Sequence, residues 1–411
     1  MKILLLNQFF WPDSSPTSQL LTDVARELAE QGHEVFAICA DGHYAPSAEE
    51  HPPRATIYRV RSTPFVRGVV GRVLSYASFY ISACWRSFRM PRPDLVISLT
   101  TPPLLSLLGN GLSLLCGSRH FIWEMDMYPD VAVDLGQFEK GGIADKMTGL
   151  LADWSRRHAD GIIALGECMK ERLIRRGISA ERISVAQNWA DSKAVTPLPF
   201  TTERNYLSLL YSGNFGMAHD ADTILDTMRM LRADTRFQFL FVGGGVHHTR
   251  LKVLAEKEGL HSVHVKDYVP RAELGQSLSA ADIGLVTQRD QCCGSVVPSK
   301  VYALLAAARP ILFIGPDRAT PARLIREYGC GWHVPCGAVD QLVQLLFYLS
   351  CHLEEVRSAG QRARQALVEY FDLPLGVARI VQITGTQNMA VRKHDTSMNL
   401  GAAISSTQSP M

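Results

Sequence analysis

The sequence predicts an α/β protein made of two Rossmann-like, doubly wound domains, and three observations support this prediction. Short apolar runs of strand length alternate with helical patterns, the alternation pauses at a stretch around residues 197–203 and then restarts, and 411 residues exceed a single-core domain. Alternation of this kind is typical of parallel sheets covered by helices on both faces. We therefore expect domains at residues 1–192 and 206–370, with a ligand cleft between them.

In the first domain, the alternation begins with a strand at Lys2–Asn7. A helical pattern with Leu20, Leu21, Val24, Ala25 and Leu28 on one face follows, and Gly32 is its expected stop. Further strands are expected at 33–40, 94–100, 120–123, 161–165 and 183–186.

In the second domain, the same alternation predicts another parallel sheet. Its strands are expected at 207–212, 237–242, 263–266, 283–286 and 311–314. Residues 371–384 are expected to return to the first domain. Residues 385–411, rich in Ser, Thr, Gln and Gly, are expected to be a disordered tail.

The composition indicates a globular protein without a strong charge preference. The net charge of +2 points to no nucleic-acid partner, and no apolar run reaches the ~18 residues that span a bilayer. Nine scattered cysteines, an odd number, suit a reducing cytoplasm and match no zinc pattern. We expect a cytoplasmic protein with no bound metal and no cofactor.

The stretch from Ser295 to Pro310 places a small polar residue and a lysine at the opening of an apolar helix. Ser299 and Lys300 follow an expected strand and loop, and the first N–H groups of a helix are unpaired. Such a helix start attracts phosphate, and Lys300 would add a full charge. The alternative is an ordinary Pro-Ser helix start with a solvated lysine.

Two glycine-rich loops follow the first two strands of the second domain. The first holds Gly213, Asn214, Gly216 and His219, and the second holds Gly243, Gly244 and Gly245. Glycines let the backbone approach a ligand closely, while Asn214 and His219 offer donors. Either loop alone could be a plain turn, but together with Lys300 they favour a nucleotide or phosphate pocket.

An acidic segment follows a strand of the first domain. Trp123-Glu-Met-Asp126-Met-Tyr-Pro-Asp130 carries three carboxylates. A carboxylate at the cleft could orient or deprotonate an acceptor hydroxyl, and Asp126 is the candidate. The alternative is that Asp130 caps the helix beginning near Val131 while Asp126 holds a loop.

The segment from Val66 to Met90 is apolar and aromatic with arginine as its only charged residue type. Together with the apolar runs in Leu104–Leu115, it could lie on an anionic membrane surface. Packing of these helices on the sheet is the alternative. The corresponding expectation is peripheral attachment at the inner membrane.

The chain resembles the bacterial family 4 glycosyltransferases of the GT-B fold, in particular the exopolysaccharide and O-antigen branch. The resemblance rests on eight short motifs that occur in the same order as in that family. The motifs lie at Gly32–Val35, Thr100–Pro103, Asp126–Asp130, Gln187–Asp191, Tyr211–Gly216, Phe241–Gly245, Ala280–Asp282 and Val297–Lys300. The resemblance as a whole extends from the start of the chain to about residue 372.

The resemblance implies transfer of a sugar from a nucleotide-diphosphate donor, bound by the second domain, to a lipid-linked or polysaccharide acceptor against the first. It further implies retention of the anomeric configuration without a metal, and a leaving diphosphate stabilised by helix starts and basic side chains. On this chain Asp126, His219 and Lys300 take the catalytic roles. The two glycine loops with Asn214 and Ser299 bind the donor, and Asp130 and Asn188 lie on the acceptor side.

The chain departs from the family pattern in several places. The two glutamates that members carry eight positions apart are absent from Ser295–Ala303, and Asn214 and His219 replace an arginine and a lysine. Residues 14–17 replace a glycine pair in the first loop, and Met125 stands where many members have histidine. These departures concern the sugar and ribose contacts.

Two other functions remain open at the level of sequence. A nucleotide-sugar epimerase of the same fold would place acidic and histidine acid/base residues around the sugar. A degenerate transferase that acts as a binding partner is the non-enzymatic reading, and the missing glutamates allow it.

Overall fold

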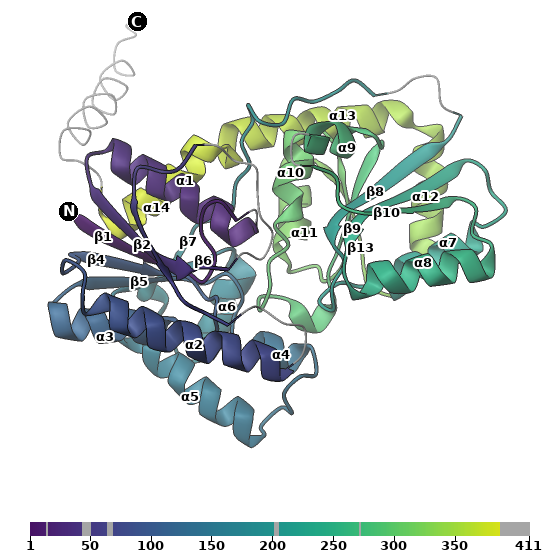
Figure 1. Cartoon of the computed structure of the whole chain (residues 1–411). Helices are drawn as coiled ribbons and strands as arrows, with labels where there is room; N and C mark the ends of the chain where they lie inside the picture. The colour runs from purple at the N-terminus through teal and green to yellow at the C-terminus, as the bar shows by residue number, and fades with distance from the viewer. Residues whose placement is uncertain (14, 43–50, 64–68, 201–204, 271–272, 387–411) are drawn as a thin grey trace, which may run out of the picture. The chain divides into compact units, whose positions relative to one another are not determined.

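The computed structural model describes residues 1–13, 15–42, 51–63, 69–200, 205–270 and 273–386. Within these residues the chain forms two parallel β-sheets with helices between the strands (Figure 1). The predicted α/β class with two doubly wound sheets is therefore confirmed. All but the first two residues of the expected tail (387–411) and part of the stretch around 197–203 lie outside the described residues.

The first sheet has seven strands in the order β3-β2-β1-β4-β5-β6-β7. Its strands are β1 (Lys2–Leu6), β2 (Glu34–Ala40), β3 (Thr56–Val60), β4 (Leu95–Ser98), β5 (Arg119–Trp123), β6 (Gly161–Ala164) and β7 (Ile183–Val185). β1 pairs in parallel with β2 and with β4, and its residues Ile3–Leu6 are fully buried. Strand β3 was not predicted, because three of its five residues, Thr56, Tyr58 and Arg59, are polar or charged and at least partly exposed.

The helices between these strands follow from the apolar pattern. They are α1 (Pro16–Glu30), α2 (Val69–Ser87), α3 (Ser106–Cys116), α4 (Asp130–Asp134), α5 (Ile143–His158) and α6 (Glu167–Arg175). α1 buries the predicted apolar residues, starts at a proline, which lacks the N–H that is unpaired there anyway, and is followed by Gly32 with φ 84°.

The second sheet has six strands in the order β10-β9-β8-β11-β12-β13. They are β8 (Leu207–Asn214), β9 (Phe237–Gly244), β10 (Val263–Lys266), β11 (Ile283–Thr287), β12 (Ile311–Ile314) and β13 (Gly331–Val334). β8 and β9 each run two residues further than predicted, so that the first glycines of both loops still belong to the sheet. The short edge strand β13 was missed.

The helices of this half complete the alternation. They are α7 (Asp222–Met230), α8 (Val246–Glu258), α9 (Leu274–Ser279), α10 (Lys300–Ala306), α11 (Thr320–Tyr328), α12 (Val339–Cys351), α13 (Leu353–Ala366) and α14 (Leu373–Thr384). None of the helices in the described part of the chain is long and apolar enough to cross a membrane.

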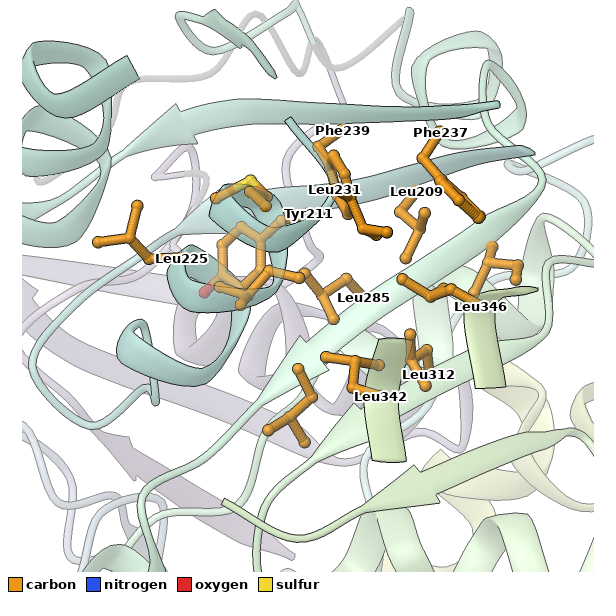
Figure 2. Packing of buried hydrophobic residues seen from close by; sticks show 14 of the residues in the cluster. Leu209, Tyr211, Leu225, Leu231, Phe237, Phe239, Leu285, Leu312, Leu342 and Leu346 are labelled. Carbon is orange, nitrogen blue, oxygen red and sulfur yellow. The ribbon is translucent and has the colours of Figure 1, made fainter. Parts of the chain in front are cut away.

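Leucine and aromatic side chains from the strands and from α7 and α12 form the core on one face of the second sheet. Figure 2 shows Leu209, Tyr211, Phe237, Phe239, Leu285, Leu312, Leu342 and Leu346 gathered there, all nearly or fully buried. Tyr211 is the polar member of this cluster. Its hydroxyl donates to the carbonyl of Asn214 (2.9 Å), which ties the core to the first glycine loop.

The described chain divides into two compact units. One holds residues 1–122, 159–161 and 377–386, and the other holds residues 123–158 and 162–376. In the first unit the His33 ring lies 2.8 Å from the carbonyl of Thr386. In the second unit, residues 123–134 and helix α6 belong together with the second sheet, so the acidic segment is part of the same unit as the glycine loops.

A buried polar triad lies beneath α3. His120 donates from Nδ1 to the Asn110 side-chain oxygen and accepts the hydroxyl of Ser98 at Nε2 (2.8 Å). All three side chains are at most 1% exposed, and burial lowers the pKa of His120 to about 3, so the ring is neutral. A β-carbon at Gly109 would lie 2.2 Å from this ring, so the triad requires glycine there.

Gly109→Ala should therefore destabilise the protein, because the added methyl group must displace a hydrogen-bonded, fully buried ring. We expect a loss of about 1–3 kcal/mol in the free energy of unfolding. Gly111→Ala in the same helix is the matched control: nothing lies within 4 Å of the added atom, so alanine should stabilise by about 0.5–1 kcal/mol. Urea denaturation of both variants measures this, and equal effects would contradict the role of the triad.

Candidate functional site

The candidate site lies where the strand order of the second sheet reverses. Strands β8 and β11 are neighbours, but the chain leaves them toward opposite edges of the sheet. Loops that diverge at the carboxyl ends of such strands leave room for a ligand. Gly213 and Asn214 end β8 here, and Thr287 ends β11.

The two predicted glycine loops pack directly on each other at this end of the sheet. Gly213 pairs with Gly243 and Asn214 with Gly244, and a β-carbon at Gly243 would lie 2.2 Å from the Gly213 carbonyl oxygen. Gly213, Gly243 and Gly245 have φ of 108°, 139° and 108°, in the region that favours glycine. Close packing of the loops thus accounts for these glycines without a ligand.

The remaining glycines of the two loops are less constrained by the backbone. Gly216 lies beside the Asn214 amide, and Gly244 lies beside the ring of Tyr268, 2.9 Å from an added β-carbon. The Asn214 side chain itself is exposed. It is therefore available at the surface of the loop.

Lys300 reaches from the start of α10 to the first glycine loop. Its ammonium donates to the Asn214 carbonyl (3.0 Å) and lies 5.0 Å from the centre of the Tyr211 ring. No carboxylate of the described residues pairs with it, and burial lowers its pKa from 10.5 to about 8. Lys300 is therefore a half-buried cation without a counter-ion in the described part of the chain, still charged at pH 7.

His219 holds Lys300 in this position. Its Nδ1 lies 2.6 Å from the Thr287 carbonyl, which can only accept, so Nδ1 carries the proton and Nε2 is left to accept from Lys300 (3.3 Å). Burial and the charge of Lys300 lower the pKa of His219 to about 3. In this arrangement the ring is neutral and positions Lys300.

The helix start at Ser299 differs from the sequence prediction in its detail. α10 begins at Lys300, as predicted, but it has only seven residues, and Ser299 makes no side-chain cap. The dipole of so short a helix is small. The positive charge at this site is therefore that of Lys300 itself.

Two carboxylates of the acidic segment are already neutralised. Glu124 is 2% exposed and accepts from Arg156 at 2.6 Å. Asp130 lies 2.9 Å from Arg172 and 3.1 Å from Arg176. Asp130 is the first residue of α4, where Pro129 holds the capping position, so the alternative that Asp130 caps this helix is wrong. Asp130 belongs instead to an arginine network.

Asp126 differs from these two neighbours because it is the exposed carboxylate of the segment. Its side chain reaches solvent, yet the surrounding protein removes much of the water near the carboxylate. This burial, together with the charge of Glu124, raises the pKa of Asp126 to about 6. Carboxylates with raised pKa values are found at functional sites more often than elsewhere.

The acidic segment is attached to the loop that leads to Lys300. The Met127 N–H donates to the Ser295 carbonyl (2.8 Å), and Ser295 donates its hydroxyl to Asp134. Arg172 donates to the carbonyls of Gln291 and Cys293. These contacts lie within the second unit, and they hold residues 123–134 against the loop between β11 and α10.

Asn188 follows β7 and is 4% exposed, with no hydrogen-bond partner for its side-chain oxygen in the described part of the chain. Trp189 beside it stacks on Trp123 at 5.7 Å between ring centres.

Most of the predicted donor-side residues lie together at the ends of β8, β9 and β11. They are Gly213, Asn214, His219, Gly243, Gly244, Gly245, Ser299 and Lys300. Asn188, at the end of a strand of the other sheet, does not belong to that group.

Three residues at the site were missed in the sequence. Gln288 directly follows β11 and donates to the carbonyls of Cys292 and Val296, which fixes the loop to α10. His247 is 6% exposed, neither of its ring nitrogens has a hydrogen-bond partner among the described residues, and burial and the charge of Arg289 lower its pKa. Arg289 makes no ion pair with the described residues. Their positions just after a strand or a glycine loop were the available signal.

Two family models match the chain in succession. A glycosyl transferase 4-like domain matches residues 18–189, and a glycosyl transferases group 1 domain matches residues 200–366. Among curated proteins, the probable glycosyltransferase WbjE of Pseudomonas aeruginosa is 28% identical over 293 residues, 69% of this chain and 72% of WbjE.

A second curated relative and a solved structure agree with these matches. The putative colanic acid biosynthesis glycosyl transferase WcaI of Escherichia coli is 26% identical over 333 residues, 74% of this chain and 81% of WcaI. The structure of HepE from Anabaena, solved in complex with UDP-glucose, is 14% identical with a TM-score of 0.69, and the match covers 94% of this chain and all of that one.

Proposed function

Because the chain belongs to the glycosyltransferases of cell-surface polysaccharide biosynthesis with two doubly wound domains, we propose that it moves a sugar from a nucleoside-diphosphate sugar to a lipid-linked glycan. The observation that carries the donor proposal is the position of Lys300, a half-buried cation without a counter-ion among the described residues. It lies at the carboxyl ends of β8 and β11, where the chain leaves these neighbouring strands toward opposite edges of the sheet. HepE, of the same fold, was solved with UDP-glucose, which supports a nucleotide sugar.

In the proposed mechanism the donor diphosphate binds at the carboxyl ends of strands β8 and β11 of the second sheet. Lys300 contributes the charge, and Arg289 near His247 offers a second cation. A fixed positive charge next to the leaving diphosphate lowers the barrier to cleavage of the glycosidic bond. His219 is a positioning residue, because it acts through Lys300.

On the acceptor side we propose that Asp126 binds and orients the attacking hydroxyl. It is the exposed carboxylate of the acidic segment, and this segment is fixed to the loop before Lys300. Asn188 and Asp130 remain predictions on this side. The arginine network around Asp130 favours a structural contribution for that residue.

We further propose that the anomeric configuration is retained and that no metal ion is required. The charge of Lys300 takes the place that a divalent cation would have on the diphosphate. Nuclear magnetic resonance of the glycoside product reports its anomeric configuration, and assays with a chelator report metal dependence. An inverted product, or activity lost on chelation and restored by a divalent cation, would refute this part of the proposal.

Lys300→Ala should weaken binding of a nucleoside diphosphate by roughly ten- to a hundred-fold, because a charge-assisted contact contributes about 1.5–3 kcal/mol. Binding of the bare nucleoside should change little. Calorimetric titration with UDP and with uridine measures both, and Lys252→Ala on the exposed face of α8 is the control. Equal UDP affinity in wild type and Lys300→Ala would remove Lys300 from the donor site.

Asp126→Asn should reduce transfer while leaving donor binding intact, because the shape stays and the charge disappears. In the wild type, transfer should decline as the pH falls through about 6, since protonation removes the same charge. Glu139→Gln, an exposed carboxylate outside this segment, is the control. Full transfer by Asp126→Asn, or loss of UDP binding in it, would assign Asp126 a structural role.

We propose peripheral membrane attachment through residues 66–90, of which 66–68 lie outside the described residues and 69–87 form α2, and through the apolar runs in residues 104–115. Val73, Leu74, Ile81, Trp85 and Phe88 are 56–73% exposed, and Arg89 stacks on Trp85 (3.6 Å). Ile81→Ser with Trp85→Ser should reduce co-flotation with anionic vesicles, because apolar area is lost from the bound face. A wild type that stays soluble with anionic and neutral vesicles alike would refute the attachment.

A further inference from the structure

Helix α5 (Ile143–His158) exposes an uninterrupted apolar stripe. Ile143, Met147, Leu150, Leu151 and Trp154 are 84%, 57%, 67%, 43% and 41% exposed. Their spacing of four, three, one and three residues puts them on one face of the helix. An ordinary surface helix would turn this face toward the core.

The opposite face of α5 carries the contacts to the protein, and it is made of small or paired residues. Gly149, Ala152 and Ser155 are buried there, and a β-carbon at Gly149 would touch Arg176. Arg156 is bonded to Glu124, and Asp153 is bonded to Arg176. The helix is thus fixed by polar contacts on one side while its large apolar side chains point away from the protein.

The charges of α5 are divided in the same way. Its two acids are both partly buried and have hydrogen-bond partners: Asp153 pairs with arginines, and Asp145 accepts the N–H of Gly141 in the turn before the helix (2.8 Å). Its exposed ionic side chains, Lys146 and Arg157, are both basic and flank one edge of the stripe. Just before the helix, Glu139 and Lys140 are both exposed and cancel each other.

We propose that α5 lies in the headgroup region of an anionic lipid bilayer, with its apolar stripe inserted and Lys146 and Arg157 against the phosphates. An exposed apolar face flanked by basic residues is the pattern of interfacial helices. A second copy of the chain fits less well, because a two-fold contact between two antiparallel α5 helices would bring the basic edges together. This inference depends neither on the donor site nor on α2.

The apolar part is tested with Leu150→Ser together with Trp154→Ser. Flotation of the full-length protein with vesicles of phosphatidylcholine and phosphatidylglycerol should show affinity reduced by roughly ten-fold or more, because each lost side chain removes buried apolar area. The matched control is Met230→Ser with Val253→Ser, two apolar positions on α7 and α8 that are 57% and 58% exposed. Unchanged binding of the α5 variant, or an equal loss in the control, overturns the proposal.

The electrostatic part is tested with Lys146→Glu together with Arg157→Glu. Binding to the anionic vesicles should again fall by about ten-fold, while binding to phosphatidylcholine alone should change less. Lys252→Glu with Lys257→Glu on α8 changes the net charge by the same amount and should leave binding nearly intact. An equal loss in both double variants would mean a non-specific charge effect and overturn the assignment.

Two further readouts separate this inference from its alternatives. Sedimentation without lipid reports the oligomeric state, and a dimer that Leu150→Ser with Trp154→Ser dissociates would identify a second copy as the occupant instead. UDP binding should be the same in all variants. Vesicle binding without UDP binding in the wild type would refute the proposed donor site and leave the α5 inference standing.

Discussion

The interaction on which the candidate site depends is that of the Lys300 ammonium with the carbonyl of Asn214, the Nε2 of His219 and the Tyr211 ring. It joins the start of α10 to the end of β8, two segments 86 residues apart. Lys300 has no carboxylate partner among the residues that the structure describes, and its burial costs free energy, as its lowered pKa shows. A cation kept in such a place is suited to an anionic ligand.

The surroundings of Lys300 fix it on several sides. Tyr211 belongs to the core of the second sheet, and its hydroxyl bonds the same Asn214 carbonyl that accepts from Lys300. The glycine loops pack so closely that Gly243 admits no side chain. Core packing, loop packing and the neutral His219 together hold the ammonium in one position, which is what electrostatic stabilisation of a leaving group requires.

The sequence predicted the sheets better than the interactions within the site. Apolar runs such as Ile3–Leu6 and Ile311–Ile314 identified strands because burial on both faces leaves little choice of residue. The polar edge strand β3 and the short β13 lacked that signal. The tautomer of His219 and the arginines that neutralise Asp130 depend on contacts between distant segments, which no local pattern contains. Even Gly243 and Gly245, predicted for ligand approach, are explained by their close contact with the first glycine loop.

The pH dependence of diphosphate binding by the wild type tests the central claim most directly. Titrations with UDP and uridine from about pH 7 to pH 10 give the affinity difference that the diphosphate adds, which the charge of Lys300 should determine. This difference should be largest below pH 8 and decline above it, because Lys300, with a pKa of about 8, then loses its proton in the free protein. Lys300→Arg should keep the difference across the whole range. A wild-type difference that does not change with pH would contradict the assignment of Lys300 to the donor diphosphate.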